Sequence, residues 1–138
     1  MIIQETLSYA SQGRGMLDLT QDVAAKISAS GITIGICQLF LHHTSASLII
    51  CENADPDVQR DLEAFMQRIS PDGDPLFRHT QEGPDDMPAH VRTILTQSSL
   101  SVPITQKKLV LGTWQGLYLW EHRLKPYQRK LTLTLMGD

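Results

Sequence analysis

The segment Phe77–Arg92 holds residues whose types and spacing could do chemistry. It contains two histidines, His79 and His90, and three carboxylates, and it is interrupted by one glycine and two prolines. Such a segment has few apolar side chains to bury and is rich in turn formers, so we expect a shaped loop. A neutral imidazole can bind a metal ion or accept a proton. The segment therefore predicts a site, and the plainer interpretation is a pair of solvated loop histidines.

A short helix is expected to follow this loop. Pro88 suits a first helical position, and Val91, Ile94 and Leu95 supply an apolar stripe at helical spacing. The N-cap would be Asp86 or the next residue, and aspartate is a preferred cap. The second histidine of the loop would then lie in the first turn, where the helix dipole disfavours an imidazolium.

A third candidate histidine, His43, lies between two apolar, β-branched runs, 32–41 and 45–52, which predict strands. Side chains of neighbouring residues in an extended chain point to opposite faces, so His42 and His43 cannot both face one pocket. Residue 43 would share its face with Ser45 and Ser47.

Three imidazoles with one open position are the ligand set of a catalytic zinc or a similar divalent ion. His43, His79 and His90 could form such a set, although the chain has no short linear zinc motif such as HExxH. Spacing alone leaves the metal site and the solvated histidines both open.

The composition is that of a folded globular protein. The chain has 138 residues, of which 41% are hydrophobic and 20% charged, so we expect a single domain spanning residues 1–138. A net charge of −3 without a basic, aromatic-rich patch argues against a nucleic-acid partner. No apolar run is long enough for a membrane span and no basic leader is present, so we expect a cytoplasmic protein. The two cysteines, Cys37 and Cys51, lie in strand-like runs and are expected to be buried thiols.

The elements that must position the site follow from periodicity. The pattern predicts an α+β fold with mainly antiparallel sheets, β-sandwich-like, and two or three helices. The first helix should begin with Thr20 as its N-cap and end at Gly31. The expected strands are Ile2–Ala10, Ile32–Leu41, Ser45–Glu52, Leu100–Thr105, Leu109–Gly112, Thr113–Arg123 and Lys130–Met136.

A second helix has a strong start signal. Asp55 is expected to be its N-cap, Pro56 its first residue and Asp57 a favourable charge in the first turn. The buried stripe of this helix is predicted to be Val58, Leu62, Phe65, Met66 and Ile69.

The predicted strand Thr113–Arg123 carries further polar candidates. Alternation places Thr113, Gln115, Glu121 and Arg123 on one face, at its two ends. Taken alone, charges at a strand end are better explained by a surface salt bridge than by catalysis.

Four motifs carry a resemblance to a known family. They are His43-Thr44-Ser45-Ala46, the run Glu52–Val58, the run Glu82–His90, and Gly112-Thr113-Trp114-Gln115-Gly116 followed by Glu121-His122-Arg123. In this order and spacing they resemble the YjbQ family over nearly the whole chain. One departure is Cys51, where asparagine is more usual before the Glu-Asn pair. A thiol there could be an extra ligand, although a packed cysteine is the simpler interpretation.

The resemblance implies a small α+β fold assembled as a homotrimer, with the histidines at 43, 79 and 90 holding a metal ion. It also implies a secondary thiamine-phosphate synthase activity, a side reaction that leaves the physiological reaction open. The resulting hypothesis is a transferase that depends on a divalent ion, zinc first among the candidates, and acts on a small phosphorylated molecule.

Each remaining polar residue has an expected role in this hypothesis. Asp86 would orient a ligand histidine or act as a base, and Glu121 is the other candidate base. Residues expected to bind substrate are Thr44, Ser45, Thr113, Gln115 and Arg123. Two alternatives stay open: a metal-assisted hydrolase that uses the same three histidines, and a non-catalytic trimer that binds a metal or an anion.

Overall fold

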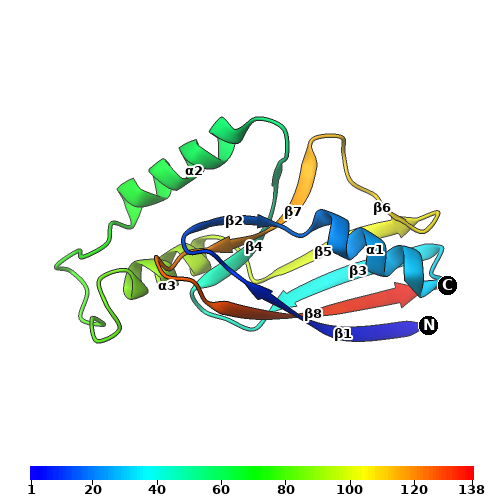
Figure 1. Cartoon of the computed structure of the whole chain (residues 1–138), viewed down its shortest axis with the longest axis horizontal. Coiled ribbons are helices and arrows are strands. Elements are labelled where there is room, and N and C mark those ends of the chain that lie inside the picture. Colours follow the sequence, from blue (N-terminus) through cyan, green and yellow to red (C-terminus); the bar gives the residue numbers. More distant parts are fainter.

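The computed structural model describes residues 1–138 and contains two antiparallel sheets (Figure 1). The larger sheet has five strands in the order β1-β8-β3-β5-β6. Its first and last strands in the chain are neighbours, with Ile2 opposite Met136, so the two ends of the chain lie side by side. Its strands are β1 Ile2–Ala10, β8 Gln128–Gly137, β3 Ile34–Leu41, β5 Ser99–Thr105 and β6 Lys108–Leu109.

The smaller sheet has three strands in the order β2-β7-β4 and sits beside the histidine site. They are β2 Gly15–Asp18, β7 Gln115–Glu121 and β4 Ala46–Glu52. Helix α2 contacts β2 and helix α3 contacts β4, so the smaller sheet is covered on the side away from the core. Consequently β7 is buried at every residue from Gly116 to Glu121.

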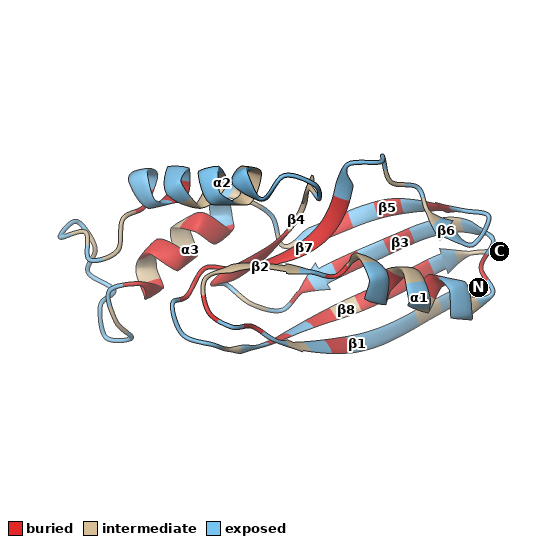
Figure 2. Cartoon of the chain, turned by 45° about the horizontal axis from the view of Figure 1, so that its top comes forward, coloured by how far each residue is buried: buried red, intermediate tan, exposed pale blue.

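The hydrophobic core lies between the two sheets and helix α1, Thr20–Ser30. Only one face of the large sheet packs against this core. Figure 2 shows buried and exposed residues alternating along β3 and β5. Leu39 is 1% exposed, whereas Ile36 and Phe40 on the other face of β3 are 46% and 50% exposed. The predicted α+β fold with antiparallel sheets is confirmed.

Helix α1 ends as predicted but begins differently. Gly31 follows it with φ +82°, the left-handed conformation that glycine adopts most easily. The prediction of Thr20 as N-cap is wrong, because its hydroxyl accepts a hydrogen bond from the Leu117 amide at 2.9 Å. The carboxylate of Asp18 instead accepts from the Thr20 amide, and so takes over the capping of this end.

Helix α2, Pro56–Ile69, starts as the sequence predicts. The Asp55 side chain accepts a hydrogen bond from the Asp57 amide at 2.9 Å, and Pro56 is the first residue. The predicted buried stripe is only partly correct, because Met66 is buried while Phe65 and Ile69 are 56% and 45% exposed.

The inward face of α2 is partly polar, which explains the difference. Glu63 accepts hydrogen bonds there from the indole of Trp120 at 3.2 Å and from the guanidinium of Arg92 at 2.5 Å. With this polar residue on the inward face, some apolar side chains of α2 lie on its outward face.

Removing the N-cap of α2 should lower the free energy of unfolding. Replacing Asp55 by alanine leaves the Asp57 amide without its acceptor, so we expect a loss of about 1 kcal/mol. Urea denaturation checks this value. Asp61→Ala on the same helix, at an exposed residue 3.8 Å from Arg60, is the control and should change the free energy by less than about 0.5 kcal/mol. Equal effects of the two substitutions would contradict the capping role.

Helix α3, Asp86–Leu95, begins two residues before the predicted start, with Asp85 as N-cap. The prediction of Asp86 as cap is therefore wrong. The predicted apolar stripe is also wrong in part, since Ile94 is 81% and Leu95 56% exposed. The buried face instead contains Arg92, which is drawn inward by Glu63 of α2. None of the three helices is long and apolar enough to cross a membrane.

Candidate functional site

Two of the three predicted histidines meet at one end of the molecule. His79 lies on the loop between α2 and α3, and Asp86 and His90 lie one turn apart on α3. One ligand atom from each of the three residues lies within 4.8 Å of the other two. The helical spacing of four residues puts Asp86 and His90 on the same face, and the loop brings His79 to that face.

The two carboxylate oxygens of Asp86 face different groups: one faces two histidines and the other faces an arginine. Oδ2 lies 2.6 Å from Nε2 of His79 and 3.3 Å from Nε2 of His90, whereas Oδ1 lies 3.0 Å from Nη1 of Arg123. The Asp86 side chain is only 3% exposed. One oxygen is therefore held by an arginine, and the other faces both imidazoles.

The ring of His90 is oriented by the backbone of the loop that follows β3. Its Nδ1 lies 2.8 Å from the carbonyl oxygen of Thr44, which can only accept a hydrogen bond, so Nδ1 carries a proton. In the neutral ring Nε2 then has a lone pair that faces a carboxylate oxygen. The two acceptors repel each other weakly at this distance, and a metal ion bound between them would remove that repulsion. This arrangement is typical of a metal-binding histidine, whose second nitrogen donates to a fixed acceptor.

The charge around the site favours a cation. Arg123 donates from Nε to Asp85 at 2.9 Å and from Nη2 to the Glu82 carbonyl at 2.8 Å. Burial raises the pKa of Asp85 and Asp86, but hydrogen bonds outweigh it and bring both below the usual aspartate value. For Asp85 the hydrogen bond comes from Arg123. For Asp86 it comes from His79, and the positive charge of Arg123 lowers the pKa further. Two carboxylates and one guanidinium leave a net charge of about −1 beside the imidazoles.

His43 is outside this group. Its Nε2 accepts a hydrogen bond from the backbone amide of Lys130 at 2.8 Å. Burial, followed by the charge of Arg129, lowers the pKa of His43, so the ring is neutral and its other nitrogen carries the proton. In this arrangement the His43 ring has no lone pair left for a metal ion. Asp86, predicted as an orienting residue or base, is the third member of the group.

The predicted substrate-binding residues are distributed over the molecule. Thr44 is exposed and lies at the site, through its carbonyl contact with His90. Ser45 is buried, and its hydroxyl accepts from Arg129 at 3.0 Å. Thr113 and Gln115 lie at the opposite end of β7 from Arg123, roughly 20 Å away for a strand of this length. Arg123 itself is occupied by carboxylates, which does not support the phosphate-binding role predicted for it.

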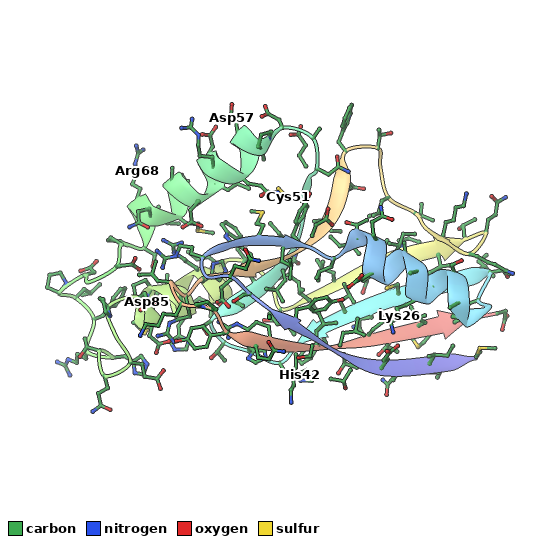
Figure 3. All side chains as sticks on the ribbon, in the orientation of Figure 1. Lys26, His42, Cys51, Asp57, Arg68 and Asp85 are labelled. Carbon is green, nitrogen blue, oxygen red and sulfur yellow. The ribbon has the colours of Figure 1, made fainter.

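Glu121 and Cys51 also lie away from the two imidazoles. Glu121 is 1% exposed and ion-paired with Arg129, which does not support its predicted role as a base. Cys51 is half-buried near the far end of β4, and Figure 3 shows it well apart from Asp85. Cys51 is not part of the group formed by His79, Asp86 and His90. The expectation of a buried thiol holds for Cys37 and only in part for Cys51.

The sequence predicts no role for Asp85 and Arg129, which the structure places beside the site residues. A signal existed for Arg129, since it has the same parity along β8 as the buried Leu131, Leu133 and Leu135. An arginine in a buried register requires an anionic partner. For Asp85 the only signal is its place beside Asp86 in the loop.

A cavity of about 320 Å³ opens beside His79. Phe77 and Met87 are its two hydrophobic residues, and His79 and Asp74 are its only ionisable ones. The site is thus next to a space large enough for part of a small molecule.

Comparison with known proteins gives a consistent result. Residues 5–138 match the family model described as UPF0047 protein YjbQ-like. The chain is 47% identical over 135 residues to the UPF0047 protein sll1880 of Synechocystis, covering 98% of this chain and 92% of that protein. It is 37% identical to the UPF0047 protein YjbQ of Escherichia coli O157:H7 over the whole of both chains.

Solved structures show the same fold. The conserved hypothetical protein TT1486 from Thermus thermophilus superimposes with a TM-score of 0.86 at 30% identity, covering 96% of this chain and 99% of that one. An uncharacterised YjbQ/UPF0047 protein from Clostridium acetobutylicum gives a TM-score of 0.83 at 34% identity, covering 97% and 99%. The sequence and the fold therefore agree, and the chain belongs to the YjbQ (UPF0047) family.

Proposed function

We propose that His79, Asp86 and His90 bind a divalent metal ion, with zinc as the first candidate, and that the protein is a small metal-dependent enzyme. The observation that carries this proposal is the lone pair of His90 Nε2 facing a carboxylate oxygen at 3.3 Å, with Nδ1 already bonded to the Thr44 carbonyl. Two imidazoles and one carboxylate are a common ligand set of catalytic zinc.

The proposed reaction is a transfer on a small phosphorylated molecule, similar to thiamine-phosphate synthesis. A bound divalent ion would supply an open coordination position and stabilise negative charge on a departing diphosphate. The exposed Thr44 would contact the phosphate group, and the cavity beside His79 would accept part of the substrate. Arg123 would hold Asp86 in place through Oδ1 rather than bind the phosphate.

The positions of the carboxylates favour a transferase over a hydrolase. A hydrolase needs a base to activate water, but Asp86 is hydrogen-bonded to His79 through one oxygen and ion-paired with Arg123 through the other, and Glu121 is ion-paired with Arg129. In thiamine-phosphate synthesis the attacking thiazole nitrogen has its own lone pair, so the reaction needs no strong base.

A homotrimer remains part of the proposal. Ile34, Ile36 and Phe40 form exposed apolar positions on the open face of β3, and a neighbouring subunit could bury them. Thr113 and Gln115, which are remote from the histidines of their own chain, would then be candidates for contacts with a neighbouring chain.

Metal content tests the proposal directly. Protein purified without a histidine tag should contain close to one metal ion per chain by elemental mass spectrometry after incubation with zinc. We expect His79→Ala, Asp86→Asn and His90→Ala to lose the metal, with folding checked by circular dichroism. His43→Ala should keep it, and loss of the metal in that variant would restore the three-histidine set predicted from the sequence. A wild-type protein that takes up no divalent ion would overturn the proposal.

Turnover separates an enzyme from a binding protein. Wild-type protein loaded with zinc should couple a thiazole phosphate to a pyrimidine diphosphate, and Asp86→Asn should not. A wild-type protein with full metal content that forms no product, also with other phosphorylated substrates, would favour a non-catalytic metal-binding protein.

A further inference from the structure

A buried ion pair lies behind the histidine site, at the junction of the two sheets. Arg129 of β8 is 4% exposed and Glu121, at the end of β7, is 1% exposed. The guanidinium donates to both oxygens of the carboxylate, from Nε to Oε1 at 2.8 Å and from Nη2 to Oε2. Neither side chain contacts the metal-binding residues, yet both bond to the backbone segments that hold them.

Arg129 is connected to two backbone segments that contact histidines: one contacts His90 and the other contacts His43. Its Nη2 also donates to the carbonyl of Ser45 at 3.2 Å and to the Ser45 hydroxyl at 3.0 Å. The preceding residue, Thr44, has the carbonyl that accepts from His90 Nδ1. The residue after Arg129 is Lys130, whose amide donates to His43. One guanidinium therefore anchors the segments that orient two imidazoles.

Glu121 connects to the segment that carries Arg123. Its Oε2 accepts from the Arg123 amide at 3.1 Å, and its Oε1 accepts from the Ser11 hydroxyl at 2.7 Å. That hydroxyl in turn accepts from the amide of Tyr127 at 2.9 Å. The guanidinium carbons of Arg123 and Arg129 lie 5.0 and 5.1 Å from the centre of the Tyr127 ring. Arg123 is thereby held through its backbone and beside an aromatic ring.

We propose that Glu121 and Arg129 form a positioning pair for the metal site. Arg129 fixes the Thr44 carbonyl, which keeps the proton of His90 on Nδ1 and leaves Nε2 free to bind. Glu121 fixes the backbone of Arg123, which holds Oδ1 of Asp86 and leaves Oδ2 facing the histidines. The proposal rests on the proposed metal-binding function, and it assigns Glu121 a role that requires no proton transfer.

The chemistry of the pair supports this role over simple packing. A buried ion pair adds little net stability compared with apolar side chains of similar size, because both charges lose hydration. An arginine fork instead supplies several donors in fixed directions. Here the donors of Arg129 bond to the carboxylate of Glu121 and to the carbonyl and hydroxyl of Ser45. Glu121 is two residues from Arg123, and Ser45 follows Thr44.

Two measurements on Arg129→Lys test the proposal. Lysine keeps the charge beside Glu121 but cannot reach Ser45 with the same fork. We expect zinc affinity, measured by competition with a chromophoric chelator, to fall about 10- to 100-fold. On metal-free protein, nitrogen-15 NMR of the histidine rings should show His90 as the Nδ1–H tautomer in wild type and as a mixture in the variant. The control Lys125→Met removes an exposed cation from the loop that precedes β8 and should match wild type in both measurements.

The possible outcomes separate the two proposals. Wild-type affinity and an unchanged His90 tautomer in Arg129→Lys would overturn the positioning role. A loss of affinity without a tautomer change would overturn it too, because the loss would then not come through His90. A tautomer change with unaltered zinc affinity would overturn the link to the metal. If wild type binds no metal, the proposed function fails, while the tautomer change alone decides whether Arg129 positions His90.

A second variant covers the case in which Arg129→Lys does not fold. Glu121→Gln has nearly the same shape and keeps one acceptor oxygen, but it breaks the charge pair. It should move zinc affinity and the His90 tautomer in the same direction by a smaller amount. No change in either readout would overturn the proposal.

Discussion

Replacing Arg123 by methionine should lower the free energy of unfolding at pH 7 by about 3–5 kcal/mol, the range for breaking a buried ion pair from one side. The substitution leaves Asp85 and Asp86, 7% and 2% exposed, as carboxylates without their shared cation. Asp85 keeps one donor, the Leu124 amide at 2.9 Å. Urea denaturation at pH 7 measures the loss.

The loss should shrink in acid. In the wild type, burial raises the pKa of both carboxyls, but the hydrogen bonds described above outweigh it, so both folded-state values lie below the unfolded ones. Such groups contribute stability that is present above the unfolded pKa, near 3.9, and is lost as the pH falls through the folded pKa. The difference between wild type and Arg123→Met should therefore be largest at neutral pH and decline below about pH 4.

The exposed Arg60 supplies the matched control. Arg60→Met removes a guanidinium that lies 3.7 and 3.8 Å from Asp57 and Asp61 on the surface of α2, and should cost less than about 1 kcal/mol. If Arg123→Met also costs less than that, the two aspartates are not held by Arg123 in the folded protein.

His122 should make the wild-type protein less stable in mild acid. Its ring is fully buried, with Nε2 2.7 Å from the Ser47 hydroxyl and no partner for Nδ1. Burial, and then the charges of Arg92, Arg14 and Arg129, lower the pKa of His122 from 6.5 to about 3. The unfolded chain therefore takes up a proton below pH 6.5 that the folded chain refuses until about pH 3. The stability is complete above the unfolded pKa and is lost as the pH falls, by about 2 kcal/mol between pH 7.5 and pH 5.

The variant His122→Gln isolates this contribution. Glutamine can still bond to Ser47 but does not titrate, so the part of the acid loss due to residue 122 should disappear. Urea denaturation of both proteins at pH 7.5 and pH 5 provides the comparison, and other titrating groups cancel because both proteins contain them. Pairs of curves that shift equally with pH would show that His122 is not buried in its neutral form.

The segments with strong local signals could be predicted residue by residue. The start of α2 at Asp55 and Pro56, the end of α1 at Gly31 and the strand Ile2–Ala10 all agree with the structure. The short strand Gly15–Asp18 was missed, because four residues show too little alternation for a strand to be distinguished from a turn. The loop that carries His79 and the helix that carries His90 were also predictable as a candidate site.

The partners of each candidate side chain depended on contacts between distant parts of the chain. The sequence predicts His43 as a third metal ligand, whereas in the structure its Nε2 accepts a hydrogen bond from the amide of Lys130, 87 residues away. The sequence predicts Glu121 as a base and Arg123 as a phosphate-binding residue, yet each is paired with an oppositely charged side chain that the fold brings close. Which face of α3 is buried was likewise decided by Glu63 of α2.

The sequence by itself therefore determined most of the elements, the antiparallel α+β fold and the segment that carries the candidate site. Caps, turns and alternation act within a few residues, so their hydrogen bonds can be read locally. The tertiary structure alone decided which nitrogen of His90 keeps a lone pair and which cation each carboxylate is paired with. The physical reason is that a lone pair or a charge is available only where no other group uses it, and here those other groups come from strands far apart in the chain.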